Sequence, residues 1–179
     1  MARKPRTKAK GASRAAFRLT SPNIQPNGPI AMEQVFNGFG CSGRNISPEL
    51  AWSGAPPRTR SFALLVHDPD APTGGAGWWH WLVVNIPATA TQLGKDAGKP
   101  DGSGLPAGAV QVATDFGSPG WGGPCPPVGD KPHRYNFTLY ALKVERLDVS
   151  GASASLAGYM INGNAVAKAQ LTGRFGRKK

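Results

Sequence analysis

The chain has 179 residues, a net charge of +11, 17 prolines and 24 glycines. This length suits one domain with a real core, and the prolines and glycines punctuate apolar runs, which disfavours a helix bundle. Residues 1–18 carry seven Lys/Arg and residues 168–179 carry five, so the body between them has nine basic residues against all ten acidic ones. The positive charge therefore lies at the two ends of the chain. We expect a disordered basic tail over 1–16 and a short basic tail over 176–179, both solvated and neither in contact with nucleic acid.

The N-terminal basic region is not followed by the apolar segment of a signal peptide, and no stretch approaches the ~18 apolar residues of a membrane span. We therefore expect a soluble, unexported, cytoplasmic protein. Cys41 and Cys125 are too few for a disulfide scaffold and lack metal-ligand spacing, and an unexported chain normally keeps its thiols reduced. The two cysteines could still be neighbours, in which case a disulfide or thiol pair would hold two turn-rich loops together.

Three segments have strong strand patterns. Residues 61–67 form an apolar run that ends at Asp68-Pro-Asp-Ala-Pro, and residues 79–86 are rich in aromatic and β-branched residues and stop at Pro87. Residues 134–142 alternate, so one face of the predicted strand carries Tyr135, Phe137, Leu139 and Ala141. We expect three central strands.

Weaker strand patterns cover residues 15–19, 109–113 and 166–175, and residues 153–161 favour one short helix that ends at Asn162-Gly163-Asn164. Strands joined by long turn-rich loops, without a helix after each strand, favour an antiparallel sandwich over a doubly wound α/β sheet. The sequence predicts one mainly β domain over residues 17–175.

Several motifs point to other functions, but their context does not support them. Residues 38–43 match a spaced-glycine dinucleotide pattern, yet Pro48 prevents the helix that would hold a pyrophosphate. The residue after Cys125 is Pro126, which has no N–H for an oxyanion hole, and Gly-x-Ser-x-Gly is absent from the sequence. The histidines lack the helical i, i+4 spacing of a zinc protease. We therefore expect no enzyme and no metal, and keep a hydrolase as an alternative.

Polar residues stand at the ends of the three predicted central strands. Asp68 ends one strand, His80 begins another, and His133 and Tyr135 begin the third, so antiparallel neighbours would bring them to one sheet edge. Histidine N–H groups, the tyrosine hydroxyl and backbone amides over 117–123 suit a phosphate-like anion. Asp68 would oppose that anion unless it orients a histidine or meets a cationic group beside Trp79 or Trp81. The sequence thus predicts a pocket for a small anionic or zwitterionic ligand.

Five segments resemble the phosphatidylethanolamine-binding protein family: Asp68-Pro-Asp-Ala-Pro, Trp79-His-Trp-Leu-Val-Val-Asn, Pro132-His-Arg-Tyr, Asn45-Ile-Ser-Pro-Glu-Leu-Ala-Trp and Asp115-Phe-Gly-Ser-Pro-Gly-Trp-Gly-Gly-Pro-Cys-Pro-Pro. The last two are similar to the bacterial branch, often labelled Raf kinase inhibitor-like, and the resemblance runs from about Phe17 to Phe175. It implies a β-sandwich with a large central antiparallel sheet, a smaller second sheet and one or two short helices.

The resemblance also implies a pocket for phosphate, phosphorylated groups or phosphoethanolamine-like headgroups, and no cofactor. Its implied lining is Asp68, Ala71, Pro72, Trp79, His80, Gly123, Pro124, His133 and Tyr135. An inhibitor of a kinase or peptidase is an alternative function. A homodimer is also open, because Trp-rich loops leave apolar surface to cover. The chain departs from animal and plant members at Pro132, Trp79 and the Cys125 region, and it lacks room for their terminal helix.

Overall fold

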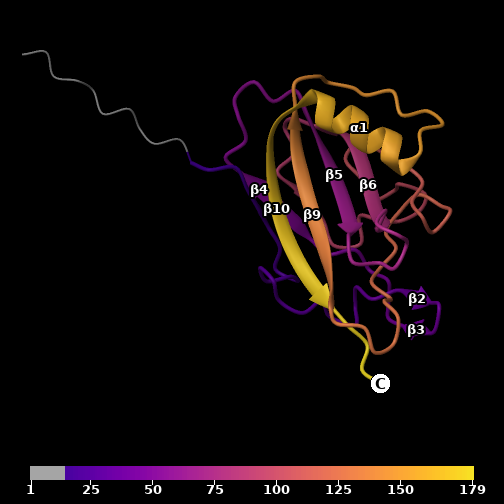
Figure 1. Cartoon of the computed structure of the whole chain (residues 1–179). Coiled ribbons are helices and arrows are strands. Elements are labelled where there is room, and N and C mark those ends of the chain that lie inside the picture. Colours follow the sequence, from indigo (N-terminus) through magenta and orange to yellow (C-terminus); the bar gives the residue numbers. More distant parts are fainter. Residues whose placement is uncertain (1–14) are drawn as a thin grey trace, which may run out of the picture.

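The structure is a computed structural model, and it describes residues 15–179; nearly all of the tail predicted over 1–16 lies outside this range. A five-stranded antiparallel sheet with the order β10-β9-β5-β6-β8 forms the centre of the domain (Figure 1). Its strands are β5 (Ser61–Asp68), β6 (Trp78–Pro87), β8 (Val110–Gln111), β9 (His133–Leu142) and β10 (Ala165–Phe175). The predicted mainly β architecture with a large antiparallel sheet is confirmed.

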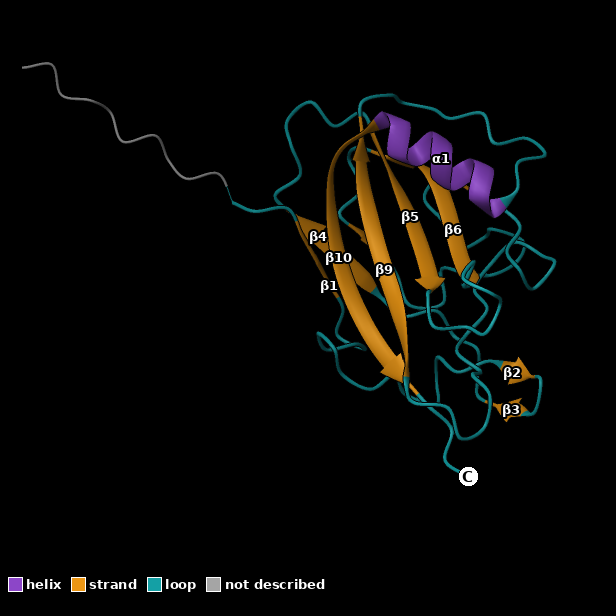
Figure 2. Cartoon of the chain, in the orientation of Figure 1, coloured by secondary structure: helices purple, strands orange, loops and turns teal. Residues whose placement is uncertain are grey.

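Smaller elements cover the two faces and one end of this sheet. A three-stranded sheet, β1 (Arg18–Thr20), β4 (Leu50–Ser53) and β7 (Gln92–Leu93), lies behind it, and helix α1 (Ala154–Asn164) lies across the opposite face (Figure 2). A separate two-stranded hairpin, β2 (Asn37–Gly38) and β3 (Cys41–Ser42), lies beyond the end of the large sheet. The sequence patterns did not predict this hairpin or strand β4.

Two apolar cores follow from the side-chain alternation of the central strands. Tyr135, Phe137 and Leu139 of β9 belong to the core between the two sheets, while Tyr140 and Leu142 of the same strand belong to the core under helix α1. Successive side chains of a strand point to opposite faces, so one strand can contribute to both cores. The predicted single face of β9 is confirmed, and it places Tyr135 on the side of the small sheet.

Helix α1 continues through Asn162-Gly163-Asn164, where the sequence predicted its end. The side-chain amides of Asn162 and Asn164 donate to the carbonyl oxygens of Gly158 and Met160, which lie four residues earlier. These bonds are made within the helix, so the asparagines support the last turn instead of breaking it. At the other end, the Ser153 hydroxyl accepts from a backbone N–H and caps the helix.

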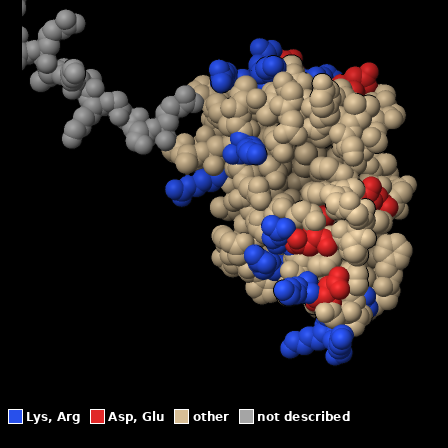
Figure 3. All heavy atoms as spheres, viewed as in Figure 1, with Lys and Arg blue, Asp and Glu red and all other residues tan. Residues whose placement is uncertain are grey.

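Acidic and basic side chains are interspersed over the lower half of the face shown in Figure 3, with basic side chains at the bottom, where the C-terminus lies. A separate hollow is lined by residues of both signs: Asp70, Asp130, Lys131, Pro132, His133, Arg134 and Arg174.

Candidate functional site: a polar pocket at the end of the large sheet

A cavity of about 230 Å³ lies where β5 ends and where β6 and β9 begin. Because the two outer strands of this group run antiparallel to β5, their starts meet its end at one edge of the sheet. The lining residues are Phe39, Asp68, Ala71, Pro72, Thr73, Trp78, His80, Phe116, Cys125, Pro126, Pro127, His133 and Tyr135. Strand ends therefore supply the polar floor, and loops supply an apolar mouth.

A β-bulge in β6 aims His80 at the cavity. The pairing of β5 with β6 passes from Val66↔Trp81 directly to His67↔Trp79, so His80 has no partner on β5. A bulge residue of this kind changes the direction of the side chains around it, and bulges commonly lie next to binding sites. Trp78 and His80 both line the cavity, whereas Trp79 between them packs on the helix side of the sheet.

Asp68 and His133 form a buried pair in the pocket floor. One carboxylate oxygen of Asp68 lies 2.7 Å from His133 Nδ1, and both side chains are only 4% exposed. The other oxygen accepts from the backbone N–H of Asp70 at 2.8 Å, which fixes the turn after β5. A carboxylate only accepts, so His133 Nδ1 carries a proton. Asp68 thus orients a histidine, which is the first of the two roles that the sequence allowed.

The second ring nitrogen of His133 points to another carboxylate. His133 Nε2 lies 3.3 Å from Asp130, whose side chain is 43% exposed in the loop before β9. The ring is therefore held from two sides and lies as a fixed wall of the pocket.

Tyr135 contributes a hydroxyl without a partner. The residue is fully buried, it lines the cavity, and its hydroxyl oxygen has no hydrogen-bond partner among the described residues. Burial, and then the negative charge of Asp68, raise the pKa of Tyr135. The hydroxyl therefore keeps its proton and can donate it to an acceptor in the cavity. A buried polar group without a partner costs about 1–3 kcal/mol, so a bound acceptor would be favoured here.

Burial favours the neutral form of His80. Burial lowers the pKa of His80 to about 4, against the opposing effects of a backbone hydrogen bond and of Asp68. Its Nδ1 lies 2.6 Å from the carbonyl oxygen of Gly122, which only accepts, so Nδ1 carries the proton. The remaining nitrogen, Nε2, is an acceptor in this state. A ligand atom that meets it must bring a proton, or the ring must take one up.

An exposed ion pair braces the turn that follows β5. Asp70 accepts from the backbone N–H of Arg134 at 2.8 Å and from the Arg134 guanidinium at 2.9 and 2.6 Å. These hydrogen bonds lower the pKa of Asp70 to about 2. The turn that carries Ala71 and Pro72 is thereby tied to the start of β9.

The structure brings together six of the nine residues predicted for the pocket: Asp68, Ala71, Pro72, His80, His133 and Tyr135. The prediction was wrong about the position of the other three. Trp79 stacks on His67, 4.3 Å between ring centroids, on the far face of the sheet. Gly123 and Pro124 are buried and do not line the cavity. The part of this loop that lines it begins at Cys125.

Several of the loop amides predicted to hold an anion are engaged within the protein. The N–H groups of Gly117 and Gly122 donate to the carbonyl oxygens of Thr114 and His80, and that of Gly123 donates to the Asn45 side chain. These three donors tie the loop over 117–123 to itself, to β6 and to Asn45. The side chains of the floor are therefore the better candidates for anion contacts.

Sequence reasoning missed six lining residues, five of them apolar: Phe39, Thr73, Trp78, Phe116, Pro126 and Pro127. Period-2 alternation from His80 could have indicated Trp78, because residues i and i+2 of a strand share a face. Nothing in the sequence around Phe39 indicated that it lies at this pocket, since its position depends on a hairpin that packs from outside the sheet.

Cys41 and Cys125 are joined by a disulfide, so the expectation of reduced thiols is not met. The bond links β3 to the pocket wall, as the alternative of a pinned loop pair predicted. Arg177, in the segment expected to be a solvated tail, donates to the carbonyl oxygens of Gly40 and Pro126. The C-terminal segment therefore takes part in the structure of the pocket mouth.

A family model matches most of this chain. Residues 20–176 match the model described as phosphatidylethanolamine-binding protein, so the chain belongs to that family. A relative named UPF0098 protein YbcL, from Escherichia coli strain K12, is 56% identical over 162 residues, which is 90% of this chain and 88% of the relative. A second, UPF0098 protein YbhB of the same strain, is 44% identical over 89% of this chain and 99% of its own length.

The crystal structure of E. coli YbcL matches this chain with a TM-score of 0.88 at 54% sequence identity. The match covers 90% of this chain and 99% of the YbcL chain. Its title calls that protein a new member of the mammalian PEBP family. A Mycobacterium tuberculosis relative, 38% identical over 88% of this chain and 71% of its own length, is named a putative lipoprotein, LppC.

Over residues 15–179, no helix has the length and apolar character needed to cross a membrane. In the same range, no group of three His, Cys, Asp or Glu side chains is placed to hold a metal ion.

Proposed function

We propose that the pocket binds a small phosphorylated or otherwise anionic group, with the His80 ring and the Tyr135 hydroxyl as its polar contacts. The observation that carries the proposal is the Tyr135 hydroxyl, which is buried, protonated and without a partner at the cavity. The name of the family supports the same class of ligand. The protein would act as a ligand-binding or regulatory protein instead of an enzyme.

The proton on His80 adds a condition to this proposal. The neutral ring offers a lone pair, which would repel a fully ionised phosphate, whereas an imidazolium would donate to it. A bound anion stabilises the charged ring and so raises its pKa. Binding is therefore coupled to proton uptake by His80, and affinity should increase as the pH falls through the bound-state pKa of His80 toward about 4. A phosphate monoanion can also supply the proton itself.

Titration of the full chain with inorganic phosphate, followed by NMR of the histidine rings, tests the proposal. We expect the His80 resonances to shift with phosphate, and Tyr135→Phe to weaken binding roughly fivefold or more, because it removes one hydrogen bond to a charged group. Tyr140→Phe is the matched control, since Tyr140 lies on the same strand in the core on the opposite face. Unchanged His80 resonances at millimolar phosphate would refute the proposal.

No specific observation supports the alternatives that the sequence left open, a peptidase or kinase inhibitor and a hydrolase. Cys125 is in a disulfide, so its sulfur is not a free nucleophile. The Thr73 hydroxyl, also at the cavity, lies 3.0 Å from the carbonyl oxygen of Gly77 and donates to it, not to a histidine. Turnover of phosphoesters that is lost in His133→Ala would favour the hydrolase.

A further inference from the structure

The hairpin over residues 37–42 has little to hold it in place by itself. Its strands contain two residues each and pair only as Asn37↔Ser42 and Gly38↔Cys41. An isolated two-stranded hairpin is marginally stable at best. At its tip, Phe39 has a left-handed backbone, with φ 53°, and is 71% exposed. Ties to the rest of the molecule must therefore keep this hairpin at the pocket.

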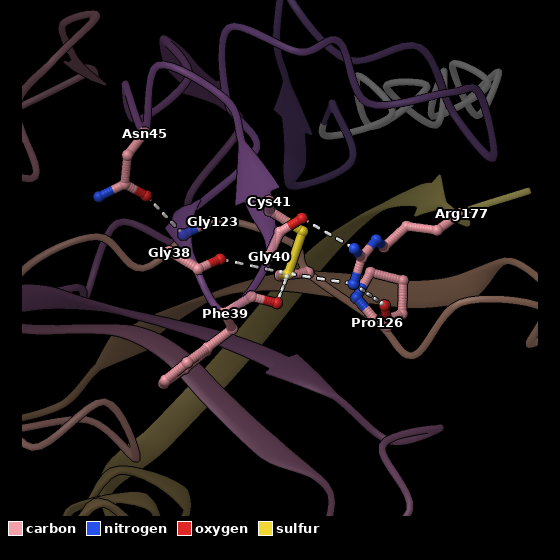
Figure 4. Close-up of a disulfide and its surroundings, with 9 residues drawn as sticks. Gly38, Phe39, Gly40, Cys41, Asn45, Gly123, Pro126 and Arg177 are labelled. Atoms are coloured by element: carbon pink, nitrogen blue, oxygen red, sulfur yellow. Dashed lines mark hydrogen bonds between the residues drawn. A yellow bond between two sulfur atoms is a disulfide. The ribbon is translucent and has the colours of Figure 1, made fainter.

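One of those ties is covalent (Figure 4), and next to the hairpin the Phe36 N–H donates to the carbonyl oxygen of Pro124 at 3.1 Å. The disulfide joins Cys41 of the hairpin to Cys125 of the pocket wall. Arg177 donates to Gly40 through Nη2 at 2.8 Å, and the ring of Phe39 stacks on that of Phe116 with centroids 6.0 Å apart. The last two contacts are exposed or at the surface, so each contributes little compared with a covalent bond.

The disulfide is also part of the pocket. Cys125 and Phe39 both line the cavity, and Cys125 Sγ lies 3.6 and 3.5 Å from the carbonyl oxygens of Gly38 and Phe39. Both cysteines are half-buried, so the residues that carry the bond are partly exposed to solvent. A change in the bond would therefore change the mouth of the site directly.

A guanidinium stands beside one sulfur of the pair. Arg177 Nη1 lies 3.8 Å from Cys125 Sγ and 3.3 Å from the carbonyl oxygen of Pro126, which orients it (Figure 4). A nearby cation stabilises a thiolate, and a stabilised thiolate leaves faster in thiol–disulfide exchange. The two sulfurs are therefore not equivalent, and Cys125 is the better leaving group.

We propose that Cys41–Cys125 is a reactive disulfide that exchanges with a dithiol and controls the pocket mouth. A thiolate of the dithiol attacks Cys41 Sγ, the S–S bond breaks, and Cys125 leaves as a thiolate beside Arg177. The second thiol of the dithiol then displaces Cys41 from the mixed disulfide. The dithiol is oxidised to its disulfide, and its two electrons and two protons reduce both cysteines. Reduction frees the hairpin and withdraws Phe39 from the mouth.

The first test measures reactivity and does not depend on a ligand. The oxidised full chain is reduced with dithiothreitol, samples are quenched with an alkylating reagent, and mass spectrometry counts the labelled cysteines. Arg177→Gln should slow reduction roughly tenfold through loss of leaving-group stabilisation, Arg177→Lys should retain most of the rate, and the neighbouring exposed charge variant Lys178→Gln should match the wild type. An Arg177→Gln rate equal to wild type would overturn the assignment.

The direction of attack has its own readout. With a monothiol such as 2-mercaptoethanol and N-ethylmaleimide as quench, peptide mapping should find the monothiol on Cys41 and the maleimide on Cys125. The reverse pattern would contradict the role given to Arg177. These sites are far apart in the sequence, so the two peptides are separated without ambiguity.

The proposal that the disulfide controls the pocket mouth rests on the proposed function, that the pocket binds an anion. A binding experiment can distinguish failure of one from failure of the other. Phenyl phosphate, whose ring would extend from the floor toward Phe39, is titrated into the oxidised chain and into Cys41→Ser/Cys125→Ser. We expect a loss of roughly threefold to tenfold in affinity for the double variant, from lost aromatic contact, and a smaller change for inorganic phosphate. Equal affinities refute the control alone, whereas absence of binding to the oxidised chain refutes the pocket and leaves the reactivity result standing.

Discussion

The floor and the mouth of the pocket are built in different ways. The floor belongs to three paired strands, and its buried groups are set by a β-bulge at His80 and by the Asp68–His133 pair. The mouth is a four-residue pairing and a proline-rich loop, joined by a disulfide. Networks inside a sheet fix geometry by many bonds, whereas the mouth has one covalent tie and a few contacts near the surface. We therefore expect floor and mouth to fail under different perturbations.

The largest effect should come from the floor. Asp68→Ala removes the acceptor of buried His133 Nδ1 and of the Asp70 amide, and breaking a buried pair on one side typically costs about 3–5 kcal/mol of unfolding free energy. Urea unfolding at pH 7 measures it. Glu145→Ala, which breaks the exposed pair with Arg60, should cost less than about 1 kcal/mol. A loss for Asp68→Ala as small as this control would show that the pair does not organise the floor.

Reduction of the disulfide should have the next largest effect on stability. The bond closes a loop with a sequence separation of 84, and removal of a native disulfide typically costs about 2–5 kcal/mol. Unfolding of oxidised and reduced chain in urea gives the difference. The His80 environment should be unchanged in the reduced native state, because the floor does not use the disulfide. Loss of the folded His80 signals below the unfolding transition would contradict the division into floor and mouth.

Acid should weaken the floor through His80. Its folded-state pKa of about 4 lies below its ordinary value, so from pH 6.5 downward the unfolded chain takes up a proton that the folded chain does not. Stability is therefore unaffected by this group above pH 6.5 and falls as the pH drops toward 4, by about 2.5 kcal/mol between pH 7 and pH 4.5. His80→Gln should remove this part of the pH dependence. The same slope in both chains would refute the assignment.

The smallest effect should come from the rim. Asp70→Asn weakens three hydrogen bonds to Arg134, but the two side chains are 31% and 48% exposed, and such pairs contribute about 1 kcal/mol or less. The unfolding free energy should change by no more than this at pH 7, and the difference should shrink in high salt. A loss of several kcal/mol would mean that the turn after β5 controls the floor.

The sequence predicted the floor well because strand patterns carry that information. Alternation over 134–142 placed Tyr135 on the correct face, and the polar residues at strand ends were expected to meet at one edge. The position of Trp79 was wrong because Trp79 and His80 are neighbours in sequence on a strand, so they cannot share a face except at a bulge. The bulge lies between His80 and Trp81, not between Trp79 and His80. Trp78, two residues before His80, therefore lines the cavity in place of Trp79.

The mouth could not be predicted in the same way. Phe39, Phe116 and Pro127 come from loops whose packing is set by tertiary contacts instead of a local period. The amides over 117–123 were expected to be free because a glycine-rich loop has many donors, but the fold of the loop itself uses those of Gly117, Gly122 and Gly123. The end of α1 was missed for a similar reason, since Asn162 and Asn164 bond within the helix.

NMR of the His80 ring while the pH is varied, with and without phosphate, in the oxidised full chain reports directly on the floor of the pocket. We expect a pKa of about 4 without phosphate and an increase of roughly one unit or more when phosphate is bound, because the anion stabilises the imidazolium. An identical titration curve in the presence of saturating phosphate would contradict the proposal that this floor binds an anion.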